Sequence, residues 1–170
     1  MYATRKNPRR LVLIDVENVC QGQLGTSFAF AAKLVERVIG VSAADQVVVA
    51  ACARSFRHIG WGHPGWRYLV RNGQDGAEIA LIEVLNSEHV KSRFDHVVIV
   101  SGDHRFTPET ARLTAHGIHV TVVAWRGGLA ASLRLAANEV RWLEPDTQKQ
   151  RVKYLPSAST LMPNLGRKAA

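Results

Sequence analysis

Short apolar runs rich in β-branched residues recur along the chain and are separated by longer, more polar segments. Four runs are clear and one is weaker because it begins with polar and aromatic residues. Runs of this length and composition predict buried strands. The clear runs are residues 11–16, 46–53, 96–100 and 118–125, and the weaker one is residues 66–70.

The segments between the runs show helical spacing of apolar residues, with a proline or glycine near two of their ends. They predict helices over residues 28–39, 75–85, 108–115 and 129–137. Because continuous apolar strands alternate with helices, we expect an α/β fold with a central, mainly parallel sheet of about five strands and helices on both faces.

The domain organisation follows from where this pattern stops. We expect one domain over residues 11–143, a basic segment over residues 1–10, and a flexible basic tail over residues 144–170. The tail has two open interpretations, an unstructured solubilising end or an arm that contacts phosphate. No apolar run approaches the roughly 20 residues of a membrane helix. Acidic residues interrupt the run after the basic start, unlike a signal peptide, so we expect a cytoplasmic protein without a membrane partner.

Charge adds a candidate partner. The chain has 22 Lys and Arg residues against 14 acids, which gives a net charge of +8. A basic protein attracts polyanions such as nucleic acid, with an affinity that falls with salt. Cys20 and Cys52 lack the spacing of metal ligands.

Three carboxylates lie where predicted strands or loops meet helices. Asp15 ends the first run, Asp103 follows the 96–100 run, and Asp75 opens the helix that carries Glu78. Ligands of open parallel sheets gather at the carboxyl ends of the strands, where the strand order reverses. Clustered carboxylates repel one another, so a hard cation such as Mg²⁺ or Mn²⁺ would offset their charge and could support phosphodiester hydrolysis.

Each acid also has a purely structural interpretation. Asp75 and Glu78 have the spacing of an N-cap and its reciprocal carboxylate. Asp15 and Asn18 could form a turn that caps backbone N–H groups. For Asp103 the functional interpretation leads, because the preceding Ser-Gly makes a close turn that directs a short acid into the strand-end crevice.

Three motifs together resemble the NYN domain family of PIN-like nucleases over residues 11–143. They are "LIDVENV" at the first run, "NGQDGAEIALIEVL" at the middle helix, and "VVIVSGDHRFTPETARLTAHGIHVTVVA" near the end. The resemblance implies a three-layer PIN-like fold and, in active members, a metal-dependent ribonuclease activity.

Carried over to this chain, the resemblance implies that Asp15, Asp75 and Asp103 bind the metal and catalyse. Asn18 and Ser101 would support them, and Glu78 would be an extra ligand. Many members carry an acid two positions after the "SGD" aspartate, where this chain has Arg105. Arg105 could contact a substrate phosphate or neutralise a nearby acid. We expect His104 to be a surface residue.

The segment over residues 54–73 interleaves arginines with aromatic residues and glycines. Such a mixture suits single-stranded RNA, whose bases stack on aromatic rings while cations follow the phosphates. The alternative is a structured loop whose tryptophans, Trp61 and Trp66, pack onto the domain. The RNA-binding candidates are Arg54, Arg57, Trp61, Arg71 and Arg126.

The leading hypothesis is therefore an endoribonuclease that uses Mg²⁺ or Mn²⁺ held by carboxylates, with single-stranded or structured RNA as its partner. Two alternatives stay open, a noncatalytic RNA-binding module and a toxin-like nuclease controlled by a protein partner. A homodimer is also left open.

Overall fold

The computed structural model describes residues 8–20, 28–56 and 63–144. The predictions for Arg57, for Trp61, for residues 1–7 and for the tail from residue 145 lie outside these ranges. None of the described helices is long and apolar enough to cross a membrane.

The centre of the molecule is a six-stranded sheet in the order β3-β2-β1-β4-β5-β6, in which every neighbouring pair is parallel. Its strands are β1 (Arg10–Asp15), β2 (Gln46–Ala51), β3 (Arg67–Val70), β4 (His96–Val100), β5 (His119–Ala124) and β6 (Glu139–Trp142). The five predicted strands are all present. The sequence pattern missed β6, because this half-buried edge strand alternates charged and apolar residues and has no continuous apolar run.

Helices connect the strands and include all four that the spacing predicted. They are α1 (Val16–Val19), α2 (Phe28–Ile39), α3 (Ala53–Phe56), α4 (Gly76–Ser87), α5 (Val90–Arg93), α6 (Thr107–Ala115) and α7 (Ala131–Ala136), with short 3₁₀ turns η1 (His104–Phe106) and η2 (Arg126–Gly128). The predicted bounds of α2 are correct, and those of the other three shift by two residues or fewer.

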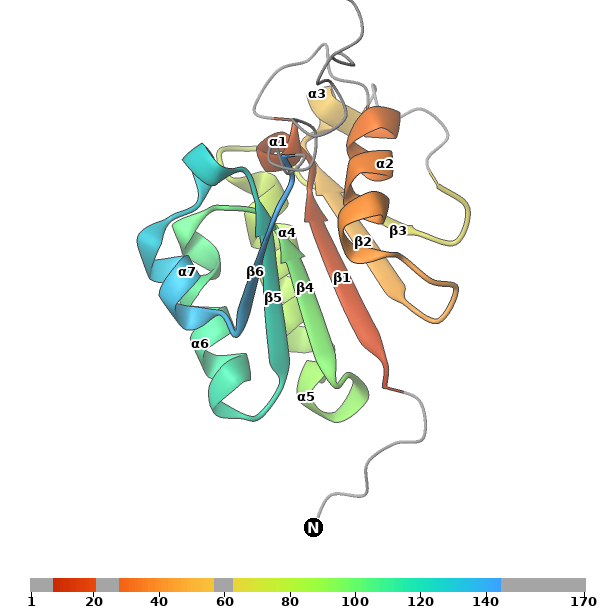
Figure 1. Ribbon diagram of the computed structural model, residues 1–170. Coiled ribbons are helices and arrows are strands. Elements are labelled where there is room, and N and C mark those ends of the chain that lie inside the picture. Colours follow the sequence, from red (N-terminus) through yellow and green to blue (C-terminus); the bar gives the residue numbers. More distant parts are fainter. Residues whose placement is uncertain (1–7, 21–27, 57–62, 145–170) are drawn as a thin grey trace, which may run out of the picture.

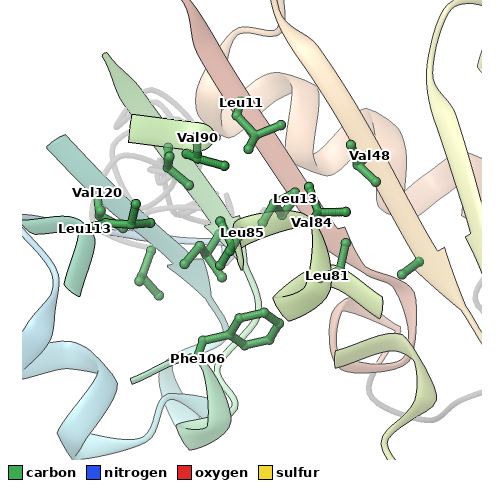
Figure 2. Packing of buried hydrophobic residues seen from close by; sticks show 14 of the residues in the cluster. Leu11, Leu13, Val48, Leu81, Val84, Leu85, Val90, Phe106, Leu113 and Val120 are labelled. Atoms are coloured by element: carbon green, nitrogen blue, oxygen red, sulfur yellow. The ribbon is translucent and has the colours of Figure 1, made fainter. Parts of the chain in front are cut away.

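Helices cover both faces of the sheet, which confirms the predicted three-layer arrangement (Figure 1). On one face the buried residues of α4 and α6 pack against alternate residues of β1, β4 and β5. Figure 2 shows this layer, where Leu81 and Leu85 of α4 lie against Leu13 of β1, with Phe106 beside them. On the other face α1 and α2 pack against the intervening residues of β1 and β2.

The strand order reverses between β1 and β4. The chain runs outward from β1 to β3, and α4 then returns it to the far side of β1, where β4 pairs in register with Ile14 opposite Val100. The first run and the run that precedes Asp103 are therefore neighbouring strands in the sheet. The arrowheads of these strands point to the end of the molecule where α1 and α3 lie (Figure 1).

Candidate functional site

Asp15 is buried at the junction of β1 and α1 and joins the two central strands. Its side chain has 0% exposure. One carboxylate oxygen accepts the backbone N–H of Asn18 over 3.2 Å, and the other accepts the Ser101 hydroxyl over 2.9 Å. The Asn18 side-chain oxygen in turn accepts the N–H of Gly102 over 2.9 Å. The predicted turn is present, and its side chains tie the end of β1 to the end of β4.

The surroundings of Asp15 disfavour its negative charge. Burial and then the charge of Glu78 raise its pKa from 3.8 to about 7, although the bonds from Asn18 and Ser101 lower it in part. Near neutral pH this carboxyl group is therefore poised between its two protonation states. A nearby cation would favour the ionised form.

Asp103 follows β4 after a glycine that has no room for a side chain. A Cβ on Gly102 would lie 2.0 Å from the carbonyl oxygen of Gly128, so the loop after β5 packs directly on this backbone. The half-buried Asp103 carboxylate accepts the N–H of Arg105 over 2.8 Å and lies 3.3 Å from Nδ1 of His104. His104 is itself exposed, as predicted.

Asp75 precedes α4 in the left-handed conformation, with φ of 59°, and its side chain makes no capping bond to the helix. The capping interpretation of Asp75 is therefore wrong. The carboxylate forms an ion pair with Nη1 of Arg105 instead. The sequence left two roles open for Arg105, contact with a substrate phosphate or pairing with an acid. In the structure Arg105 pairs with an acid.

Glu78 and Glu17 line an open hollow of about 350 Å³ together with Asn18, Trp125 and Gly128. Burial raises the pKa of Glu78, and the charges of Asp103, Asp75 and Glu17 raise it further, against a bond to its own backbone N–H. Glu78 thus lies at the centre of the acidic residues rather than at their margin.

Glu17 is the acid that the sequence reasoning missed. One of its oxygens accepts the N–H of Cys52 over 2.8 Å, and the other is buried without a hydrogen-bond partner among the described residues. Its place two residues after Asp15 in "DVEN" was the available signal. The bond to Cys52 connects residues far apart in the sequence, so the local pattern did not reveal it.

The chemistry of these side chains fits a hard divalent cation. They offer oxygen ligands, neighbouring acids raise the pKa values of Asp15 and Glu78, and one oxygen of Glu17 has no hydrogen-bond partner among the described residues. As arranged in the described ranges, however, no three His, Cys, Asp or Glu side chains surround one common point. The acids share one end of the sheet but do not form a ready coordination shell.

The basic candidates lie on or next to separate elements at this end, whereas the aromatic residue Trp66 comes just before β3 begins. Arg54 is exposed on α3, and Arg71 forms an ion pair with Glu83. The Arg126 guanidinium lies 4.9 Å from the ring centre of Trp142. Trp66 stacks on His63 and packs against the core, as the structured-loop interpretation predicted for this residue.

Comparison with known proteins supports the family and the fold. A family model described as the NYN domain matches residues 69–144, which confirms the resemblance seen in the motifs. The match includes Asp75, Glu78 and Asp103 but not Asp15. An NYN domain implies a nuclease-type, PIN-like fold.

A crystal structure of a protein of unknown function from Vibrio parahaemolyticus is similar in fold, with a TM-score of 0.58 and 20% sequence identity. The alignment covers 85% of this chain and 98% of that one. No curated protein matches the chain significantly.

Proposed function

Proceeding from the NYN match, we propose that this protein is a metal-dependent endoribonuclease that hydrolyses RNA phosphodiester bonds at the carboxyl ends of β1 and β4. One observation carries the proposal. Acids from three separate segments converge where the strand order reverses, and their mutual repulsion helps to raise the pKa values of Asp15 and Glu78. Perturbed acids at such a position are typical of functional sites.

The proposed roles follow the contacts of each acid. Asp15, Asp75 and Asp103 would hold Mg²⁺ or Mn²⁺, with Glu78 as a further ligand. Ser101 and Asn18 would keep Asp15 in place through the hydrogen bonds described above. When bound, the ion would supply a water of lowered pKa and neutralise charge on the phosphodiester.

RNA would be held by the basic residues around this end. Arg105 is the nearest of them to the acids, because it pairs with Asp75. Arg54, Arg71 and Arg126, together with Arg57 and Trp61 outside the described ranges, are the further candidates. The net charge of +8 supports a polyanionic substrate, and binding should weaken as salt is raised.

Cleavage of labelled single-stranded and structured RNAs, in Mn²⁺, Mg²⁺ or EDTA, tests the proposal. Asp103→Asn should lower metal-stimulated cleavage by roughly 100-fold or more, while circular dichroism shows an intact fold. Asp95→Asn is the matched control, since Asp95 accepts an N–H from Arg9 at the opposite end of the sheet. Undiminished cleavage by Asp103→Asn would contradict the proposed mechanism.

The ion pair between Arg105 and Asp75 favours a second candidate, a noncatalytic RNA-binding module. In such a protein the guanidinium would replace the cation that a nuclease needs. RNA binding that leaves every substrate uncut, with or without metal, would favour this module over the enzyme.

A further inference from the structure

Arg105 lies between two of the site's carboxylates. Its backbone N–H donates to Asp103 over 2.8 Å, and its guanidinium pairs with Asp75. The side chains of the ion pair are 36% and 25% exposed, so water screens their attraction only in part. A guanidinium does not lose its proton in proteins. Arg105 therefore holds a permanent positive charge against Asp75.

The backbone around Asp75 leaves its carboxylate available to a partner outside α4. The left-handed conformation turns the side chain away from the capping role, and no bond to the first turn of the helix forms. The next residue is fixed by packing, since a Cβ on Gly76 would lie 2.2 Å from the carbonyl oxygen of Arg71. The Asp75 carboxylate therefore makes no capping bond to α4 and pairs with Arg105 instead.

The negative charge near Arg105 exceeds that of its partner. Asp103 and Asp75 both raise the pKa of Glu78, so each of them lies close enough to repel its charge. His104 also lies near Asp103, but it is charged only when protonated. Arg105 is therefore the permanently charged group that these contacts place among the acids.

From these contacts we infer that Arg105 is an internal counter-ion that competes with divalent cations for Asp75, and that this competition sets the affinity of the acidic end for such ions. The guanidinium and a divalent ion are attracted to the same carboxylate, and they repel each other. An ion that binds there must displace Arg105 or tolerate its charge nearby. The inference rests on the proposed function, because it concerns the same acids as the metal site.

Direct binding of Mn²⁺ to the full-length protein, without RNA, tests the competition. Electron paramagnetic resonance of free Mn²⁺ gives the dissociation constant for each variant. Arg105→Gln should tighten Mn²⁺ binding by roughly three- to tenfold, and Arg105→Lys should lie between that variant and the wild type. Arg67→Gln is the control, because Arg67 begins β3 and pairs with Glu88, away from the acidic end, and the change removes the same charge. It should alter the constant by less than about twofold.

A double-mutant cycle shows whether the effect passes through Asp75. In an Asp75→Asn background, Arg105→Gln should change the Mn²⁺ dissociation constant by less than about twofold. Unchanged or weaker Mn²⁺ binding by Arg105→Gln overturns the inference, as does a lack of Mn²⁺ binding in every variant. If Mn²⁺ binds as expected but RNA stays uncut, the nuclease proposal fails and the counter-ion role stands.

Discussion

The two ends of the central sheet differ in the surroundings of their acidic side chains. At the amino end, Arg10 donates to Asp45 and to two backbone carbonyl groups. Burial opposes ionisation of Asp45, but the hydrogen bonds that its carboxylate accepts from Arg10 and Ser42 outweigh this effect and lower its pKa. At the carboxyl end, burial and neighbouring acids raise the pKa values of Asp15 and Glu78. The acid at the amino end is paired with a cation, whereas acids at the carboxyl end repel one another.

A second group of residues at the amino end follows the same rule. The ring of His96 bonds to the hydroxyl of Thr121, which donates to Glu139. A hydrogen bond from Arg141 is the main reason that the pKa of Glu139 is low. These residues join β4, β5 and β6, so paired polar groups at this end stabilise the sheet.

The difference separates residues that stabilise the fold from residues of the candidate site. Mutually repelling acids cost free energy of folding, and proteins keep such groups where a ligand or reaction uses them. At the amino end the acids Asp45 and Glu139 have arginine partners, and the pKa values of both are lowered. The contrast supports the carboxyl end as the functional end, and four measurements test it.

The largest effect on stability should come from Gly102, whose backbone packs directly against Gly128 at the carboxyl end. Gly102→Ala forces a Cβ against the carbonyl oxygen of Gly128 and should lower the free energy of unfolding by about 3 kcal/mol or prevent folding. Gly127→Ala is the control, since no atom lies within 4 Å of the added Cβ, and it should change stability by less than about 0.5 kcal/mol. Urea denaturation measures both, and equal effects would contradict the packing argument.

The next effect compares one acid from each end. Asp45→Asn loses charged hydrogen bonds at a side chain that is only 5% exposed, and should lower the free energy of unfolding by about 2 kcal/mol. Asp103→Asn relieves repulsion and keeps an oxygen that can accept the N–H of Arg105, so stability should be unchanged or higher. Chemical denaturation of the two variants in EDTA makes the comparison. A larger loss of stability from Asp103→Asn than from Asp45→Asn would contradict the assignment of the carboxyl end as the functional end.

Asp15 should make the protein less stable as the pH rises. Its pKa is about 7 in the folded chain and near 3.8 when unfolded, so the folded state binds the proton more tightly. Its contribution to stability is complete below about pH 4 and is lost as the pH rises through about 7. Denaturation midpoints in EDTA should therefore fall between pH 5 and pH 8 in the wild type and fall less in Asp15→Asn. Parallel pH profiles would show that Asp15 is ionised throughout.

His96 should give the smallest effect, with the opposite sign. Burial and then the charges of His119 and Arg10 lower its pKa from 6.5 to about 4, so the folded state binds the proton less readily. Stability from this group is complete above about pH 6.5 and is lost as the pH falls through about 4. His96→Gln should flatten the decline between pH 6 and pH 4, as measured by thermal denaturation. If His96→Gln loses as much stability as the wild type between pH 6 and pH 4, protonation of His96 does not contribute to that loss.

Much of the fold could be predicted because the relevant information is local. The β-branched runs located β1, β2 and β4, and helical spacing gave the bounds of α2. The edge strand β6 was not predicted, because the charged residues Glu139 and Arg141 alternate with its apolar residues. The positions of Asp15, Asp75 and Asp103 at strand ends and at the start of a helix were also visible in the sequence.

The partners of the site residues could not be predicted in the same way. Arg105 was noticed as a departure from the family pattern, but its pairing with Asp75 required α4 to return the chain beside β4. The role of Glu17 depends on Cys52 at the end of β2 and on the hollow that it shares with Glu78. Both contacts join segments that are distant in the sequence.

The α/β class, the alternation of the five predicted strands with helices, and the acids at the strand ends follow from the sequence alone, because propensity, periodicity and chain order are properties of neighbouring residues. Which charged side chains meet depends instead on how the segments pack. The tertiary structure brought Glu17 and Glu78 to one hollow, gave Asp75 the guanidinium of Arg105 in place of a helix cap, and buried Asp15 between β1 and β4. Charge interactions depend on distance and burial, and these are set by the packing of segments that the chain itself keeps apart.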